Sequence, residues 1–293
     1  MKPLLVSLLK TLTCGIVFFV GTMVGGIAAG WLGLPAPAMP EGSEPGALAG
    51  HLFLASLGMG ALLAFLAGRL RGRFWARWLV LAFFGWVIYS FTTYVEAKIY
   101  TTFSSASLYK VVMDLVAFVV SGGLAAGWFA PHGNGVTSPL SQMIPLRSPQ
   151  AWAWRLAVAW AAFPVIYLAF GKVVEPLVID VYRQGQLEMT APGWGQIVPA
   201  QMLRSLLFLL VCLAVMFRWQ GSRRALLSSL AVGMFLLVGG LYMLQAYWFP
   251  PGFRLVHSLE ILADSVVYAL CLGALFTPLA RPAGAQAQSL RVG

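Results

Sequence analysis

The sequence predicts an all-α integral membrane protein with eight transmembrane helices. Of the 293 residues, 60% are hydrophobic and only 10% are charged, a composition outside the range of soluble globular domains. Several runs of roughly 18 or more residues lack any charge, and each is long enough for a helix to cross about 30 Å of hydrocarbon. A transmembrane barrel would show short alternating segments instead. The lipid bilayer is therefore the first expected partner.

The predicted spans follow one another with short connections. They cover residues 4–33, 49–69, 76–99, 107–130, 151–177, 199–218, 224–248 and 254–277. The first span begins like a secretory signal, but its apolar run continues past residue 30 without a clear small-residue cleavage site, so we expect a retained helix. The three cysteines lie inside apolar runs without Cys-x-x-Cys spacing, which indicates neither a disulfide framework nor a zinc knuckle.

The net charge of +10 predicts an orientation rather than a nucleic-acid partner. Basic residues concentrate in the loops on one side of the predicted bundle, above all Arg69, Arg71, Arg73 and Arg77. Such loops stay in the cytoplasm, so both termini are expected there, in the inner membrane of a bacterium. All nine carboxylates then fall on the outer side or in the outer half of a helix. No soluble basic domain is present to bind nucleic acid.

The chain also shows signs of a parallel duplication. A linker rich in Pro, Gly and Ser occupies residues 131–150, near the middle of the sequence. A shift of 264 − 114 = 150 residues superposes Gly21 on Gly171, Arg73 on Arg223, Asp114 on Asp264 and Gly123 on Gly273. We expect a first four-helix repeat at 1–130, a second at 151–280 and a cytoplasmic tail at 281–293. An even number of spans keeps both repeats in the same orientation, as in parallel-repeat transporters.

Candidate functional residues begin with a polar stripe in the last span. Arg254, His257, Glu260 and Asp264 fall within about 120° of one another on a helix. A charge inside hydrocarbon costs a few kcal/mol or more unless it is paired or hydrated, so such residues usually face the bundle interior and have a function.

The fourth span has a matching pair, Lys110 and Asp114. If the two helices face each other across an axis, Lys110 would pair with Glu260, and Asp114 would approach Asp264 and share a proton with it. Glu96 and Arg204 are further candidates for contact with a substrate or ion. The alternative is that these polar groups only fix helix packing.

A metal site is a weaker possibility. His257 and Glu260 have the i, i+3 spacing of a helical ligand pair, and Asp264 and His51 would complete the set. No His-Glu-x-x-His motif supports it, and no cofactor is predicted.

Three classes of function remain open. The first is a transporter or permease for a small substrate, with an outward-facing polar cavity and proton or cation coupling. The second is an intramembrane enzyme that acts on a lipid or lipid-linked substrate at the outer leaflet. The third is a non-catalytic subunit of a larger complex, because the many glycines permit close contact with a partner helix or with a second copy of the chain.

Overall fold

The computed structural model is all-helical and has eight helices long and apolar enough to cross a membrane, as predicted. It describes residues 2–39, 43–102, 107–131, 138–183 and 188–277, and these contain no β-sheet. The predicted tail at 281–293 and the carboxylate of Glu41 lie outside this part of the chain. Six spans are single helices: α1 (Lys2–Trp31), α2 (Pro45–Ala67), α5 (Ser107–Trp128), α7 (Pro149–Arg183), α8 (Trp194–Arg218) and α11 (Pro251–Phe276).

The third and seventh spans are each interrupted by a π-helix. The third consists of α3 (Phe74–Trp86), η1 (Val87–Phe91) and α4 (Thr92–Tyr100), and the seventh of α9 (Arg223–Phe235), η4 (Leu236–Gly240) and α10 (Leu241–Gln245). In both spans the π-helix follows 13 residues of α-helix. A π-bulge inserts an extra residue and rotates the helix beyond it, and such bulges are frequent at functional sites.

One connection differs from the prediction. The predicted spans leave residues 178–198 as a connection, but α7 continues to Arg183 and α8 already begins at Trp194. Two prolines, Pro164 and Pro176, lie inside α7. Membrane helices accept internal prolines because neighbouring groups satisfy the freed backbone carbonyls, so Pro176 does not end this helix.

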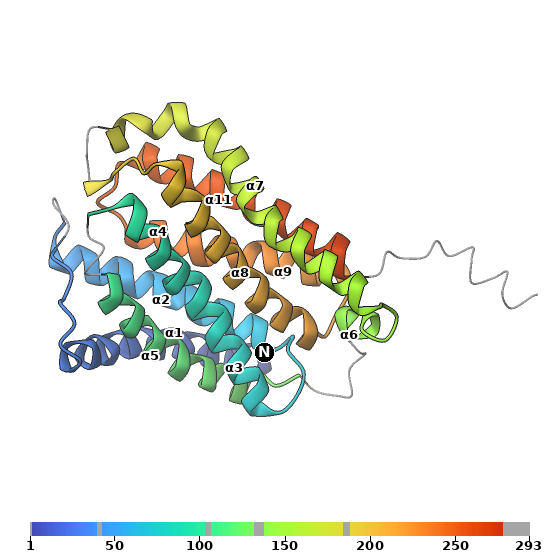
Figure 1. Cartoon of the computed structure of the whole chain (residues 1–293). Helices are drawn as coiled ribbons and strands as arrows, with labels where there is room; N and C mark the ends of the chain where they lie inside the picture. The colour runs from blue at the N-terminus through green and yellow to red at the C-terminus, as the bar shows by residue number, and fades with distance from the viewer. Residues whose placement is uncertain (1, 40–42, 103–106, 132–137, 184–187, 278–293) are drawn as a thin grey trace, which may run out of the picture.

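The spans form a bundle with two flanks (Figure 1). On one flank α5 packs against α1 and α3, and on the opposite flank α11 packs against α7 and α9. The second, third, sixth and seventh spans occupy the middle, where α2 packs against α10 and α4 against α8. The expected face-to-face arrangement of the fourth and eighth spans is therefore wrong, because the middle spans separate them.

Two short turns join the halves of the bundle at one end. Leu70 and Trp219 form an antiparallel bridge. The amide of Arg71 donates to the Arg218 carbonyl at 2.9 Å, and the amide of Gln220 donates to the Arg69 carbonyl at 2.7 Å. We call this the basic end, because its loops hold arginines 69, 71, 73, 218, 223 and 224. The opposite end, where α4 finishes and α11 starts, is called the acidic end.

Glycines allow the closest helix contacts within the chain. A Cβ atom on Gly60 of α2 would lie 2.2 Å from the Gly15 nitrogen of α1 and 2.8 Å from the Cys14 carbonyl carbon. A Cβ on Gly25 of α1 would lie 2.3 Å from the carbonyl oxygen of Met113 in α5. Backbone cannot move aside as a flexible side chain can, so these positions require glycine.

We predict that Gly60→Ala lowers the free energy of unfolding by about 1–3 kcal/mol, because the added methyl group forces α1 and α2 apart. Gly50→Ala, in the same helix with open space around it, is the matched control and should be neutral or stabilising. Thermal unfolding of the two purified variants in detergent measures the difference. Equal midpoints for both variants would contradict the packing described here.

Candidate functional site

An ion pair between Arg204 and Glu96 lies at the centre of the largest polar cluster. Arg204 Nη1 donates to Glu96 Oε1 at 2.8 Å and to Gln201 Oε1 at 3.0 Å. The Arg204 side chain is only 3% exposed and that of Glu96 is 27% exposed. Since Glu96 belongs to α4 and Arg204 to α8, the pair ties the third span to the sixth.

Tyrosines extend this ion pair toward α7. The hydroxyl of Tyr167 donates to Glu96 Oε1 at 3.1 Å and lies 3.1 Å from the hydroxyl of Tyr100. The Arg204 guanidinium carbon also lies 5.5 Å from the centre of the Tyr167 ring, within cation–π range. The guanidinium is thus held by one carboxylate, one amide and an aromatic wall.

A second hydrogen-bonded chain runs from α7 to α11. Tyr182 Oη lies 3.2 Å from His257 Nε2, and His257 Nδ1 lies 3.0 Å from Glu260 Oε2. A carboxylate only accepts hydrogen bonds, so Nδ1 carries the proton and Nε2 accepts from the tyrosine. This order, Tyr182 to His257 to Glu260, orients the imidazole as a proton carrier.

Two tyrosines of the first group and all three residues of the second border one cavity of about 240 Å³ at the acidic end. Its polar wall includes Tyr100, Tyr167, Tyr182, His257 and Glu260, together with the ion-paired residues Lys172 and Glu175. The remaining wall is mainly apolar, and the residues Leu168, Val178, Ile179, Trp194 and Ile197 contribute to it. A mostly apolar hollow with a few convergent polar groups is the usual form of a small-molecule site.

Asp264 lies one helical turn after Glu260 on α11 and has no hydrogen-bond partner among the described residues. The residue is 5% exposed, and its Oδ1 atom is fully buried. Glu260, Arg204 and Glu96 are the charged groups with the strongest influence on this carboxyl group. The buried atoms Gln201 Nε2 and Arg204 Nε also lack partners in the part of the chain that the structure describes. Buried polar atoms without a protein partner need a proton, water or a ligand.

Lys110 and Asp114 form a separate cluster. Lys110 Nζ donates to Asp114 Oδ2 at 2.7 Å, and it lies 4.3 Å from the centre of the Tyr89 ring. The hydroxyl of Tyr89 donates to Gln245 Oε1 of α10 at 2.6 Å. The expected pairing of Lys110 with Glu260 is wrong, since i, i+4 geometry within α5 gives Lys110 a nearer carboxylate.

The expected meeting of Asp114 with Asp264 is also wrong. Asp114 pairs with Lys110 in α5, whereas the charges of Glu260, Arg204 and Glu96 act on Asp264. The middle spans separate these two environments.

The remaining predicted residues are more scattered. Arg254 lies in the first turn of α11, and its Nε is buried without a partner. His51 Nδ1 lies 2.9 Å from the Leu244 carbonyl oxygen, and the imidazole stacks on Tyr247. Among the described residues, no group of three or more His, Cys, Asp or Glu side chains could hold a metal ion, so the structure does not gather the four proposed ligands.

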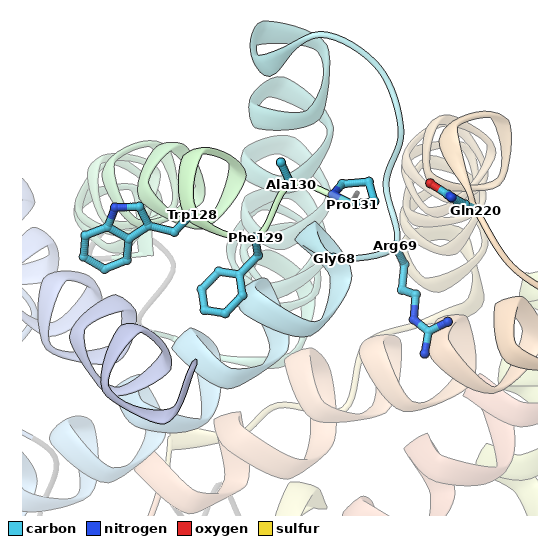
Figure 2. Close-up of a pocket in the computed structure, with 7 residues that line it drawn as sticks. All are labelled: Gly68, Arg69, Trp128, Phe129, Ala130, Pro131 and Gln220. Carbon is cyan, nitrogen blue, oxygen red and sulfur yellow. The ribbon is translucent and has the colours of Figure 1, made fainter. Parts of the chain in front are cut away.

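A larger hollow, of about 460 Å³, lies at the basic end (Figure 2). It is lined by Gly68, Arg69, Trp128, Phe129, Ala130, Pro131 and Gln220. None of the carboxylates or histidines of the acidic end reaches it.

Sequence reasoning missed four members of the site. Tyr100, Tyr167, Tyr182 and Gln201 were not among the residues singled out from the sequence. Tyr167 lies one turn before Gly171, at which an added Cβ would lie 3.6 Å from Glu260 Oε1. Comparison with protein-family models, curated proteins and solved structures finds no match, so the geometry alone must indicate what this site does.

We predict that Arg204→Gln lowers the free energy of unfolding by about 3 kcal/mol, because it leaves the Glu96 carboxylate without its cation in a largely desolvated place. Lys172→Gln is the control, since Lys172 pairs with Glu175 at 2.6 Å but is 60% exposed, and its loss should change stability by less than about 1 kcal/mol. Denaturant titration compares the two. A similarly small loss of unfolding free energy in both variants would show that the ion pair of Arg204 with Glu96 is not desolvated.

Proposed function

We propose that the protein is a transporter for a small substrate, coupled to protons through Asp264. One observation supports this above all: a buried carboxylate without a hydrogen-bond partner among the described residues lies one turn from a residue that lines a cavity. A carboxyl group in such a place binds and releases a proton or cation during function. Lys110 neutralises Asp114, so Asp264 is the better candidate for coupling than the pair of aspartates expected from the sequence.

The proton would enter from the cavity. Tyr182, His257 and Glu260 form a hydrogen-bonded chain along its wall, and Asp264 follows Glu260 by one turn of α11. Arg204 and Glu96 would respond to the charge state of Asp264, because their charges influence its carboxyl group. Protonation would thereby alter the ion pair that ties α4 to α8.

The cavity favours a small organic cation. Its volume of about 240 Å³ lies just below the range typical of drug-sized ligands. Three tyrosine rings beside the Glu260 carboxylate resemble the aromatic surroundings that proteins use for ammonium groups. The aliphatic residues would contact the apolar part of such a substrate.

We further propose the parallel duplication and the orientation expected from the sequence. The duplication is supported by contacts that recur in both halves. α1 packs against α5 as α7 packs against α11, and α2 packs against α10 as α8 packs against α4. The π-helices begin 236 − 87 = 149 residues apart, one fewer than the 150 that separate Asp114 from Asp264. Arginine-rich loops would place the basic end and both termini in the cytoplasm of a bacterial inner membrane, with the cavity facing outward.

The test uses proteoliposomes that contain a pH-sensitive dye. Small amines and quaternary ammonium compounds are added outside, and we expect at least one of them to drive a proton flux. Asp264→Asn should reduce this proton flux at least about tenfold, since the amide cannot exchange a proton. Asp180→Asn, near the end of α7, is the control and should leave it unchanged. No flux with any compound, or full flux in Asp264→Asn, would contradict the proposal.

The second candidate is an intramembrane enzyme, and the Tyr182–His257–Glu260 chain is the observation that favours it. A histidine oriented by a carboxylate and bonded to a hydroxyl is the arrangement of an activated nucleophile. A lipid or lipid-linked substrate would reach it between α7 and α8. Covalent labelling of Tyr182 by a lipid-like electrophile, abolished by His257→Ala, would support the enzyme over the transporter.

A further inference from the structure

Two arginines at the basic end lack a counter-charge in the part of the chain that the structure describes. The ion pairs found there are those of Lys110, Lys172, Arg204 and His257. Among the described residues, Arg69 and Arg218 therefore have no carboxylate partner, although the backbone bonds between their turns bring them close together. Neighbouring like charges repel each other, so an anion that bridges them would stabilise this end.

The two guanidinium groups are placed reciprocally. A Cβ on Gly72 would lie 3.0 Å from Arg218 Nη1, and a Cβ on Gly221 would lie 3.8 Å from Arg69 Nη1. Each arginine thus extends over the glycine of the other turn, and both glycines have positive φ, 113° and 145°. A larger side chain at either glycine would be strained and would crowd the guanidinium.

An indole N–H converges on the same place. Trp219 is fully buried, and its Nε1 has no hydrogen-bond partner among the residues that the structure describes. This nitrogen would lie 3.1 Å from a Cβ on Gly221, on the same side as Arg69. Buried donors without an acceptor are rare in proteins. An oxyanion between the turns would give this donor an acceptor and the arginines a counter-charge.

The hollow beside these turns has an apolar side. Figure 2 shows Trp128 and Phe129 on one side and Arg69 and Gln220 on the other. Trp128 is 40% exposed, and Gln220 Oε1 is buried without a partner. An aromatic wall next to guanidinium and amide groups fits a molecule with a charged head and an apolar body.

We propose that Arg69 and Arg218 bind the phosphate of an anionic phospholipid, whose glycerol and upper acyl region occupy the hollow at Trp128 and Phe129. Arginine matches phosphate oxygens with its planar set of donors, which lysine cannot do. Basic loops next to membrane helices attract anionic lipids. A free phosphate shares the head-group chemistry but would not use the apolar wall. This site is independent of the cavity at the acidic end.

Native mass spectrometry of the purified full-length protein, titrated with phosphatidylglycerol, tests the proposal. The wild type should retain one lipid more tightly than the rest. The double variant Arg69→Gln/Arg218→Gln should lower the affinity for that lipid at least about tenfold. Arg73→Gln/Arg224→Gln removes the same charge from two other arginines at the same end and should weaken the binding of that lipid less than about threefold. Gel filtration and circular dichroism confirm that both double variants are folded.

Four outcomes would overturn the proposal. If the two double variants weaken phosphatidylglycerol binding equally, the lipid is held by general electrostatic attraction to this end. If neither variant weakens it, Arg69 and Arg218 do not bind the lipid. Binding of phosphatidylcholine as tightly as phosphatidylglycerol would exclude recognition of the anion. In a separate arm, pyrophosphate that binds Arg69 and Arg218 while phosphatidylglycerol does not would make the ligand a soluble phosphate.

Discussion

The Arg204–Glu96 ion pair is the interaction on which the acidic end of the protein depends. Arg204 is almost wholly removed from solvent, so it can lose Glu96 only by leaving a charge uncompensated inside the bundle. The pair fixes α4 against α8, and through Tyr167 it also fixes α7. These three helices supply much of the cavity wall. The shape of the cavity is therefore set by a single electrostatic contact and the aromatic groups around it.

A related contact crosses the bundle in the other direction. Gln245 stands 245 − 96 = 149 residues after Glu96, and it accepts a hydrogen bond from buried Tyr89. The ends of the third and seventh spans, beyond their π-helices, thus each bond to a helix of the opposite half. Glu96 and Gln245 stand at nearly equivalent positions, but their partners differ in place and in chemistry, since Arg204 in α8 gives an ionic contact and Tyr89 in η1 a neutral one. Asp114 and Asp264 differ in the same way, because only Asp114 has a cation at hydrogen-bond distance. If the halves arose by duplication, their polar sites have diverged, and the unpaired carboxylate belongs to the half with the cavity.

The sequence was sufficient to predict the helices but not their neighbours. Length and hydropathy predict eight spans, because backbone in hydrocarbon must satisfy its own hydrogen bonds. The stripe of His257, Glu260 and Asp264 likewise predicts a buried polar face. Which helix that face meets depends on packing between distant segments, and apolar helix surfaces carry little information about it. The pairing of Lys110 within its own helix could have been foreseen from its i, i+4 spacing with Asp114. The π-helices and the continuation of α7 through Pro176 could not, because both depend on tertiary contacts.

A double-mutant cycle on Glu96 and Arg204 tests the central claim most directly. Unfolding free energies would be measured for the wild type, Glu96→Gln, Arg204→Gln and the double variant in one detergent. A desolvated pair predicts a coupling energy of at least about 1.5 kcal/mol, with the double variant more stable than the sum of the single losses implies. A coupling energy below about 0.3 kcal/mol would contradict it, because residues that do not touch have additive effects.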